Sequence, residues 1–353
     1  MTQEMNSSSG KPVHARGSDT STGTAASGSL AGRRAWIISD GVRGHLAITG
    51  GVAETLGLAT EVKLVAPRWL WRKLAPRGPA DPIALKPMLD EPLPDVVFGA
   101  GRQTVPFVRA LKRAGQGRVF TVIFQSPKAG ADCAHLVWAP EHDRLTGANV
   151  IATLVPPHRF SSARLAELRR EVPAAIAALP CPRVALFLGG PGGSYDYSPA
   201  TIAAFGQALA GVAPLAGSFL ITPSRRTPPV LLKAADEATA SRPRILWDGS
   251  VENPYPQFLA HADVFIVTAD SVNMAGEACA TGRPVYVFTP PGGRSKFQRF
   301  HAALATHGAT RPLPASAPAT LGGWTYEPLQ AAATVAAEIE RRWRAFRSTN
   351  PGR

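Results

Sequence analysis

Two short segments combine residue types that can bind and activate a substrate. The first, DGVRGH, follows the apolar run 35–39 and contains Asp40 and His45 with the glycines Gly41 and Gly44. An imidazole titrates near neutral pH and can remove a proton from a hydroxyl group. Glycines let a backbone approach a ligand closely, and free N–H groups at a helix start favour an anion. A histidine that only caps a helix or lies on the surface is the alternative.

The second segment, ADSVNMAGE, follows another apolar run. Asp270, Ser271 and Asn273 would open a helix whose first N–H groups can meet a phosphate. Met274 belongs to the same turn, and we include it among the nucleotide-binding residues. Glu277 lies one turn after Asn273, where it can accept hydrogen bonds from ribose hydroxyls. A capping box would give a similar pattern, so a structural role stays open.

Glycines and arginines follow two further runs and suit a diphosphate. LGGPGGSYD, residues 188–196, contains four glycines, Gly190 among them. TPSRRTPP places Ser224, Arg225 and Arg226 where we expect a strand to end and a helix to begin. A hydroxyl, two guanidinium groups and helix N–H groups would then converge, and each charge-assisted bond is worth about 1.5–3 kcal/mol. A solvated arginine pair on a loop is the alternative.

Two other residues are candidates for supporting roles. Trp247 ends the run RILWD, and its ring can lie against a nucleotide base or fill the core. Glu141, in the segment APEHD, is a possible acid–base group that follows a buried run. A solvated loop would look the same.

The elements that position these residues alternate between strands and helices. Short, continuous apolar runs bounded by Gly, Pro or Asp indicate buried strands, and the stretches between them have helical spacing. This alternation predicts α/β domains with parallel sheets covered by helices. In the first half we expect strands at Ala35–Ser39, Glu61–Val65, Asp95–Phe98, Val119–Phe124 and His135–Trp138, with helices at Leu46–Leu56 and Val105–Ala114. In the second half we expect strands at 184–190, 218–222, 244–248, 264–268 and 284–288.

The chain length and a proline-rich stretch predict two domains. At 353 residues the chain is about twice a typical domain. A helix from Ser162 to Ala178 lies between Pro-Pro and a second proline pair and marks the boundary. We expect a disordered tail (1–32), a Rossmann-like acceptor domain (33–158), a linker helix (159–182), a nucleotide-sugar domain (183–326), and a helix and tail (327–353) that close the two domains together.

Composition narrows the function classes. The net charge of +13 suits anionic lipid, a phosphorylated substrate or an arginine-rich surface. We expect no nucleic-acid partner, because the sequence has no helix-turn-helix or zinc-finger spacing. The three cysteines are widely separated, which predicts no disulfide framework and no structural metal. No run of eighteen apolar residues is present, so we expect a cytoplasmic protein.

The motifs together resemble those of the mitochondrial-fission ELM family. DGVRGH, GAGRQTVP, APEHD, TPSRRTP, WDGSVENPY and ADSVNMAGEACATGRPVYVF carry the resemblance, which spans residues 35–312. Bacterial members of that family are described as GT-B-type glycosyltransferases. The Ser271–Glu277 segment and its following Gly-Arg-Pro are also similar to the nucleotide-binding segment of the N-acetylglucosaminyl transferase of peptidoglycan synthesis. That enzyme has a Gly-Gly-His turn, which Gly44 and His45 match in part, since this turn lacks the doubled glycine.

The resemblance implies a glycosyltransferase with its site in a cleft between two Rossmann-like domains. The donor, a nucleoside diphosphate sugar that we expect to be UDP-linked, would bind the second domain, with Arg225 and Arg226 on the diphosphate and Glu277 on the ribose. His45 would deprotonate the acceptor hydroxyl, with Asp40 and Glu141 in reserve. GT-B enzymes use arginines and helix dipoles on the leaving diphosphate, and no DxD motif occurs here, so we expect no metal and no cofactor. The positive charge of the chain would favour a lipid-linked or anionic acceptor and peripheral contact with an anionic membrane.

Two other function classes stay open. A noncatalytic scaffold that recruits partners would keep the fold without turnover. A nucleotide-sugar epimerase would convert a sugar nucleotide with no acceptor present. A dinucleotide oxidoreductase is disfavoured, because neither half has GxGxxG after its first strand.

Overall fold

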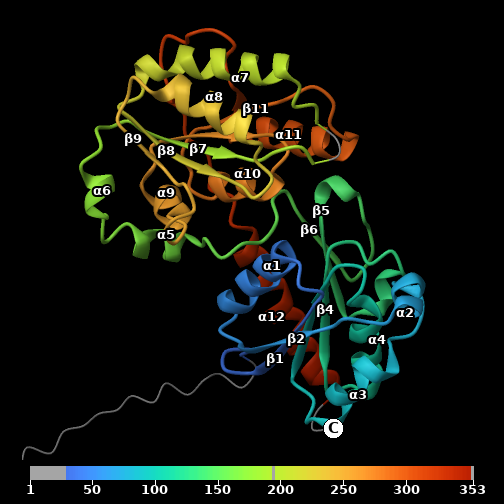
Figure 1. Cartoon of the computed structure of the whole chain (residues 1–353). Coiled ribbons are helices and arrows are strands. Elements are labelled where there is room, and N and C mark those ends of the chain that lie inside the picture. The colour runs from blue at the N-terminus through green and yellow to red at the C-terminus, as the bar shows by residue number, and fades with distance from the viewer. Residues whose placement is uncertain (1–28, 193–194, 351–353) are drawn as a thin grey trace, which may run out of the picture.

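The computed structural model describes residues 29–192 and 195–350, which form two α/β domains (Figure 1). Each domain is built on a six-stranded sheet in which all paired strands are parallel. Helices cover both faces of each sheet, as fully buried parallel strands require. The expected fold class, with two Rossmann-like domains, is confirmed.

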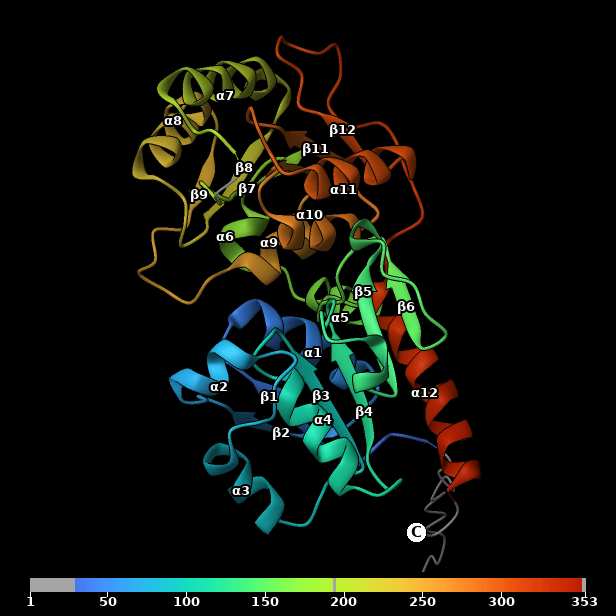
Figure 2. The same ribbon diagram turned by 90° about the vertical axis from the view of Figure 1, so that its right-hand side faces the viewer.

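In the amino-terminal domain, α1 (Arg43–Thr55) and the last helix pack on one face of the sheet, and α3 (Pro82–Asp90) and α4 (Val105–Ala114) on the other. The short helix α2 (Trp69–Leu74) lies at the outer edge of this domain (Figure 2). The strands, in the sheet order β2-β1-β3-β4-β5-β6, are β2 (Ala59–Leu64), β1 (Arg34–Ser39), β3 (Val96–Ala100), β4 (Phe120–Phe124), β5 (Leu136–Pro140) and β6 (Val150–Thr153).

In the carboxyl-terminal domain, α7 (Pro199–Val212) and α8 (Pro229–Thr239) cover one face. The other face is covered by α9 (Tyr255–His261), α10 (Val272–Cys279) and α11 (Ser295–Thr306). The strands, in the sheet order β12-β11-β10-β7-β8-β9, are β12 (Thr310–Pro312), β11 (Val285–Phe288), β10 (Val264–Thr268), β7 (Arg183–Leu188), β8 (Ser218–Pro223) and β9 (Arg244–Leu246).

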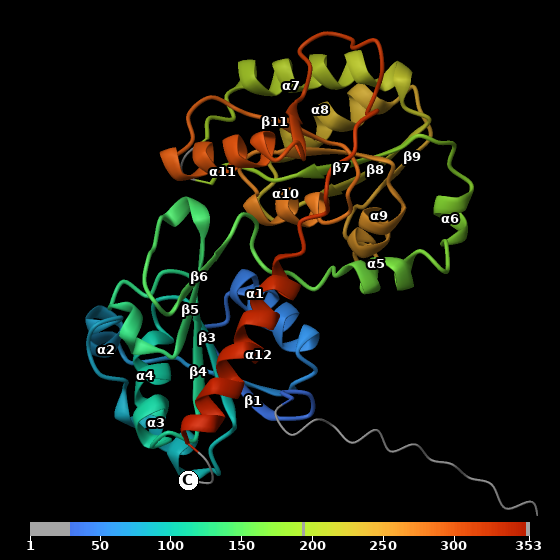
Figure 3. The same ribbon diagram turned by 180° about the vertical axis from the view of Figure 1, so that it is seen from behind.

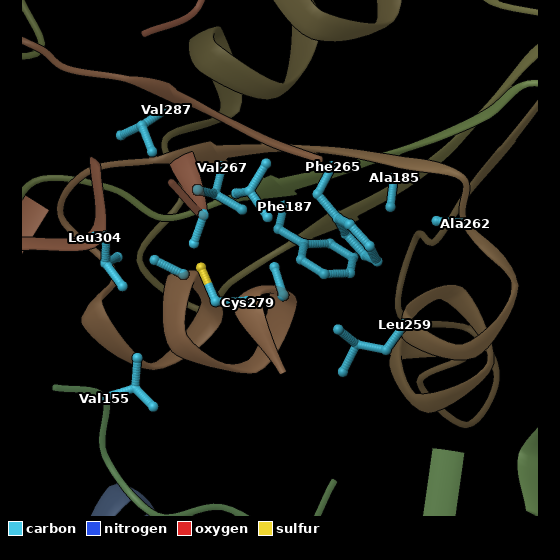
Figure 4. Packing of buried hydrophobic residues seen from close by; sticks show 14 of the residues in the cluster. Val155, Ala185, Phe187, Leu259, Ala262, Phe265, Val267, Cys279, Val287 and Leu304 are labelled. Atoms are coloured by element: carbon cyan, nitrogen blue, oxygen red, sulfur yellow. The ribbon is translucent and has the colours of Figure 1, made fainter. Parts of the chain in front are cut away.

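Strand β7 shows why the sequence forms this two-sided core. Alternate side chains point to opposite faces of a strand. Val184, Leu186 and Leu188 therefore join the cluster under α7 and α8, while Ala185 and Phe187 join the cluster under α9, α10 and α11. In the latter cluster the rings of Phe187 and Phe265 lie 5.7 Å apart, close to the apolar side of α10 (Figure 4). An apolar run without polar alternation is what burial on both faces demands.

The strand orders define one topological switch point in each sheet. In the first sheet, the chain goes from β1 to β2 on one side and then returns to add β3 on the other side of β1. The order in which strands are added therefore reverses between β1 and β3. In the second sheet the reversal falls between β7 and β10. Loops at a switch point separate to opposite faces of the sheet, and the space beyond the carboxyl ends of the two strands is where such folds bind ligands. The two switch points are therefore the first places to look for a site.

The linker differs from the single helix expected over 159–182. The structure has two short helices, α5 (Ser162–Leu168) and α6 (Ala174–Ala177), separated by a segment that includes Pro173. Proline lacks the N–H group that a continuing helix needs, and its ring clashes with the preceding turn. The chain consequently bends, and α5 packs beside α9 of the carboxyl-terminal domain.

The last helix, α12 (Ala331–Thr349), returns the chain to the amino-terminal domain (Figure 3). Val335, Ile339 and Trp343, the apolar face expected from the sequence, are buried against α1 and the first sheet. Ala331 belongs to the core of the second domain and Ala332 to that of the first. The start of α12 therefore joins the two cores, as expected of a helix that closes the domains together.

The structure corrects the expected elements in three places: the extent of the amino-terminal tail and two strands that were not expected. Residues 1–28 of the expected tail lie outside the described residues, but Leu30 is buried, and the Gly32 N–H donates to the Gly57 carbonyl at 2.7 Å. The tail prediction thus extended a few residues too far.

Strands β6 and β12 were not expected, because β6 has only four residues and β12 is a three-residue strand without an apolar run. None of the helices in the described residues is long and apolar enough to span a bilayer.

Candidate functional site

The first switch point holds an imidazole–carboxylate pair. Nδ1 of His45 lies 3.1 Å from Oδ1 of Asp40, and both side chains are less than one fifth exposed. The loop after β3 closes over them at Gly101, which has φ +91°. A Cβ at Gly101 would lie 2.5 Å from the ring of His45 and 3.0 Å from Asp40, so only glycine fits. The carboxylate fixes one ring nitrogen, which leaves Nε2 to accept a proton from another molecule.

The starts of α1 and α10 face each other across the domain junction. A Cβ built on Gly44 would lie 3.6 Å from Nδ2 of Asn273, which is exposed. Neither helix has a side-chain cap on its N-terminal residue, Val42 or Ser271, and neither has an acidic residue in its first turn. The capping-box alternative at Ser271 is therefore wrong. Two uncapped helix starts with positive dipole ends form an electrostatic environment for an anion.

A buried carboxylate organises the second switch point. Asp270, whose side chain is 1 % exposed, accepts hydrogen bonds from the Gly190 N–H at 2.8 Å and the Tyr197 hydroxyl at 2.6 Å. It also accepts one from Nη2 of Arg226 at 3.1 Å. A buried carboxylate engaged in this way cannot itself contact a phosphate, because two negative charges would repel each other. The structure thus gives Asp270 the task of joining the β7, β8 and β10 loops and holding Arg226.

The arginine segment lies in a turn and not at a helix start. Helix α8 begins at Pro229, after a turn in which the Arg226 N–H donates to Oγ of Ser224 at 3.2 Å. The expectation that these side chains meet the N–H groups of the following helix is therefore wrong. Thr227 anchors the turn by donating to the Gly189 carbonyl at 2.6 Å. Arg225 is exposed, and the side chain of Arg226 is about half exposed, so a ligand beside Asp270 can reach the Arg226 guanidinium.

Glu277, the expected ribose ligand, is partly buried and accepts a hydrogen bond from the hydroxyl of Tyr255. Burial raises the pKa of Glu277 to about 7, although the hydrogen bond from Tyr255 and the nearby Arg159 both act to lower it. Tyr255 is also partly buried, and its own pKa is raised, first by burial of the hydroxyl and then by the charge of Glu277. The carboxyl group can therefore change its charge near neutral pH.

Two other expected nucleotide-binding residues lie at the margins of this arrangement. Met274 packs against the core of the second domain and is partly buried. Trp247 follows the edge strand β9, and its Nε1 donates to the Val251 carbonyl at 2.9 Å. Since β9 lies two strands from β7, Trp247 is separated from the switch point by roughly 10 Å of sheet. The structure does not bring Trp247 next to Arg226 or Asp270.

Glu141 is not part of the His45 site. It follows β5, which lies three strands from β1, about 14 Å across the sheet. The turn 141–143 instead contacts α11 of the second domain, where Arg299 donates to the His142 carbonyl at 2.8 Å. The structure therefore does not bring Glu141, the expected reserve base, next to His45. Two segments that each follow a strand in the sequence can lie far apart in the sheet, because the strand order decides which strand ends are neighbours.

Sequence reasoning missed the two tyrosines that bind the acidic residues of the site. Tyr197 lies in the SYDY segment after the glycine-rich stretch, and Tyr255 in the ENPY segment after Trp247. Each lies far in sequence from its partner, by 73 residues for Asp270 and 22 for Glu277. A tyrosine after a strand is a weak signal, because the same residue is common in cores.

Two cavities in the described residues lie elsewhere. One of about 730 Å³ is lined by α7 and α8, and one of about 640 Å³ includes Glu141, His307 and Gln330. Neither is lined by His45, Arg226 or the start of α10. Among the described residues, no group of three or more His, Cys, Asp or Glu side chains is placed to hold a metal ion.

These features define a GT-B-like fold, in which two Rossmann-like domains face each other and a C-terminal helix returns to the first. The family model for mitochondrial fission ELM1 matches residues 43–343, and the chain belongs to that family. The mitochondrial fission protein ELM1 of Arabidopsis thaliana is 28% identical over 272 residues, which cover 70% of this chain and 64% of the plant protein. The match therefore spans less than two thirds of the plant protein.

Solved structures with the same fold include UDP-GlcNAc 2-epimerases. The Neisseria meningitidis enzyme, bound to UDP-GlcNAc, matches with a TM-score of 0.50 and 14% identity over 89% of this chain and 93% of that one. A Listeria monocytogenes protein named as a UDP-N-acetylglucosamine 2-epimerase matches with a TM-score of 0.52 and 10% identity, over 91% and 92% of the two chains. At these identities the likeness concerns the fold alone.

Proposed function

We propose that the protein is a glycosyltransferase that moves a sugar from a UDP-linked donor to an acceptor hydroxyl, at the junction of its two domains. One observation carries the proposal: the switch point with the Asp40–His45 pair lies opposite the switch point with Arg226, and the two domains approach each other where Gly44 meets Asn273. A base and an anion site are the two components that transfer from a diphosphate requires.

The donor would bind with its diphosphate at the start of α10. Backbone N–H groups of residues 272–274 and the exposed donors of Arg226 would hold the phosphate oxygens, and Arg225 would add a second cation. Negative charge on the diphosphate grows as the sugar departs, so these groups would stabilise the transition state more than the ground state. Ribose hydroxyls would donate to Glu277, one helical turn further along α10.

The acceptor would approach from the amino-terminal domain. Nε2 of His45 would take the proton of its hydroxyl as the oxygen attacks the anomeric carbon, and the bond to the diphosphate would break on the other side. Asp40 would stabilise the imidazolium that forms. Because arginine and helix N–H groups serve the leaving group, the transfer would need no metal ion. Activity that persists in excess chelator is expected, whereas loss restored only by a divalent ion would overturn this part.

Thermal shift with a panel of nucleoside diphosphates and their sugars tests donor binding. A ligand at about 100 times its dissociation constant stabilises a protein by about 2.7 kcal/mol. UDP and UDP-sugars should raise the melting temperature of the native protein, and Arg226→Gln should weaken this shift. Arg344→Gln, at an exposed site on α12, is the matched control and should leave the shift unchanged.

Product analysis then separates the proposed reaction from its rivals. A scaffold without an intact site would show no shift with any nucleotide. An epimerase would convert the sugar nucleotide in the absence of acceptor and keep the UDP linkage. A transferase releases UDP, and this release should increase when the correct acceptor is present.

A further inference from the structure

We propose that α2 and the turn after it form a docking surface for an anionic lipid bilayer. The surface consists of the apolar side chains of Trp69, Leu70 and Leu74 and the cations Arg72, Lys73 and Arg77. The proposal extends the proposed function by naming the surface from which a lipid-borne acceptor would reach the site.

The apolar part of the surface gathers three exposed large side chains on one short helix. Trp69 is 68 % exposed, and Leu70 and Leu74 are each more than 40 % exposed. No residue of α2 is buried, so packing on the domain does not explain the apolar side chains of Trp69, Leu70 and Leu74. Clusters of exposed large apolar residues mark interaction sites, and tryptophan is enriched at the interface between membrane and water.

The helix is nevertheless held firmly on the domain. Arg68, just before α2, forms three side-chain hydrogen bonds with Asp81, whose side chain is 1 % exposed. The same guanidinium lies over the ring of Trp71 at 3.9 Å. The Arg68 side chain, through its hydrogen bonds, is the largest cause that lowers the pKa of Asp81, to about 2. With Arg68 and Trp71 engaged in this way, Trp69 and the leucines face outward on a rigid support.

The positive charge of this surface indicates an anionic lipid bilayer as its partner. Residues 64–80 contain four basic residues and no acidic one, and the whole chain carries a net charge of +13. An anionic bilayer attracts such a segment with about 1 kcal/mol per cation near its surface. A symmetric contact between two copies of the chain would instead bring the same cations together. An anionic lipid surface fits both the apolar and the basic side chains.

The surface adjoins the His45 site. Arg102 donates to the carbonyls of Lys73 at 2.9 Å and Ala75 at 2.6 Å, which joins the end of α2 to the loop after β3. That loop contains Gly101, which lies against His45. A cavity of about 380 Å³ between them is lined by Trp69, Arg72, Lys73, Arg102 and Gln103. A head group at the bilayer surface would therefore lie near the proposed base.

Vesicle co-sedimentation of the full chain tests the docking surface. The native protein should bind vesicles of phosphatidylcholine with about one third phosphatidylglycerol, bind pure phosphatidylcholine weakly, and release at high salt. The double variant Arg72→Gln/Lys73→Gln should bind the anionic vesicles at least roughly tenfold more weakly. The double variant Trp69→Ser/Leu70→Ser should also lose binding, since the apolar contact is removed.

Matched controls remove charge or apolar surface elsewhere. Lys233→Gln/Arg344→Gln removes two exposed cations, and Val230→Ser/Val251→Ser removes two exposed apolar side chains of the second domain. Both controls should bind vesicles like the native protein. Equal loss in the controls, or native binding by both α2 variants, would overturn the proposal. So would native protein that ignores anionic vesicles, or that forms a dimer which the α2 variants abolish.

Nucleotide binding on the same variants separates this inference from the proposed function. The α2 variants should keep the melting temperature of the native protein and its thermal shift with UDP. Loss of vesicle binding with an intact UDP shift supports the docking surface alone. Vesicle binding without any UDP shift would leave the docking surface intact and contradict the donor site.

Discussion

The carboxylate of Asp40 and the imidazole of His45 are held 3.1 Å apart beneath Gly101, at the switch point of the first sheet. Asp40 comes from the end of β1 and His45 from the first turn of α1, so the pair depends on the sharp turn between them. Gly41 in that turn has φ +81°, a conformation that side chains with a Cβ disfavour. The pair is thus built by a strand end, a glycine turn and a helix start.

Replacement of Asp40 by Asn should reduce turnover while donor binding is preserved. The amide keeps the shape of the side chain but removes the charge that stabilises the imidazolium. We expect a decrease in the rate of sugar transfer of roughly 10²–10⁴-fold, the range typical of general base catalysis. Steady-state kinetics and UDP titration measure the two quantities. A variant that transfers sugar at the native rate would remove His45 from the role of base.

Replacement of Asp270 by Asn should weaken both the fold and donor binding. Three donors converge on this buried carboxylate, and removal of its charge leaves Arg226 without its partner. We expect a loss of about 1–3 kcal/mol in the free energy of unfolding. Tyr197→Phe, which removes one neutral donor to the same carboxylate, is the control and should leave UDP affinity largely intact. Chemical denaturation should show a larger loss in the free energy of unfolding for Asp270→Asn than for Tyr197→Phe. Equal UDP affinity in the two variants would contradict the role given to the Asp270 carboxylate.

The affinity for UDP should depend on pH through Glu277. Its pKa of about 7 means that the carboxyl group is protonated below neutral pH and accepts ribose hydroxyls best above it. We therefore expect affinity to rise between pH 6 and pH 8, by up to about tenfold per pH unit below the pKa. Glu277→Gln should remove this component. Calorimetric titration of both proteins against pH measures it, and identical slopes would exclude Glu277 from ribose binding.

Glu277 should also make the free energy of unfolding depend on pH. Because the pKa is raised in the folded state above the ordinary value of 4.5, the folded protein binds more protons than the unfolded chain between these pH values. The free energy of unfolding contributed by Glu277 therefore falls as pH rises from about 4.5 to 7. Glu277→Gln should flatten this part of the denaturation profile, and an unchanged profile would argue against the raised pKa.

Gly51 should tolerate no side chain, unlike its neighbour Gly50. A Cβ at Gly51 would lie 2.5 Å from the carbonyl carbon of His158 and 2.8 Å from the nitrogen of Arg159, in the linker between the domains. Gly51→Ala should destabilise by about 1–3 kcal/mol through overpacking. Gly50→Ala meets open space and should stabilise α1 by about 0.5–1 kcal/mol. Thermal unfolding of both variants decides whether α1 packs this closely on the linker.

The fold was predictable because local pattern and tertiary structure agree. Runs such as VALFLGG are apolar throughout, which only a strand buried on both faces requires, and β7 occupies most of that run. The linker was predicted less well, since Pro173 stops a pattern that otherwise looks helical. Short edge strands such as β12 carry too few apolar residues to be recognised without their neighbours.

The sequence indicates candidate site residues but does not reveal how the fold groups them. Asp270 stood out as an acidic residue at a helix start, yet its burial against Tyr197 depends on a contact over 73 residues that no local pattern reveals. Glu141 was grouped with His45 because both follow strands, whereas the strand order separates them. The exposed face of α2 gave no sequence signal, because Trp and Leu in a short helix usually indicate core.

Hydrogen exchange of the full chain with and without saturating UDP tests the central claim most directly. The account predicts slower exchange at the starts of α1 and α10 together, over residues 42–46 and 271–275, with added protection in the arginine turn at 224–227. Protection confined to the groove between α7 and α8, or to one domain with the start of α1 unchanged, would contradict a donor site between the two switch points.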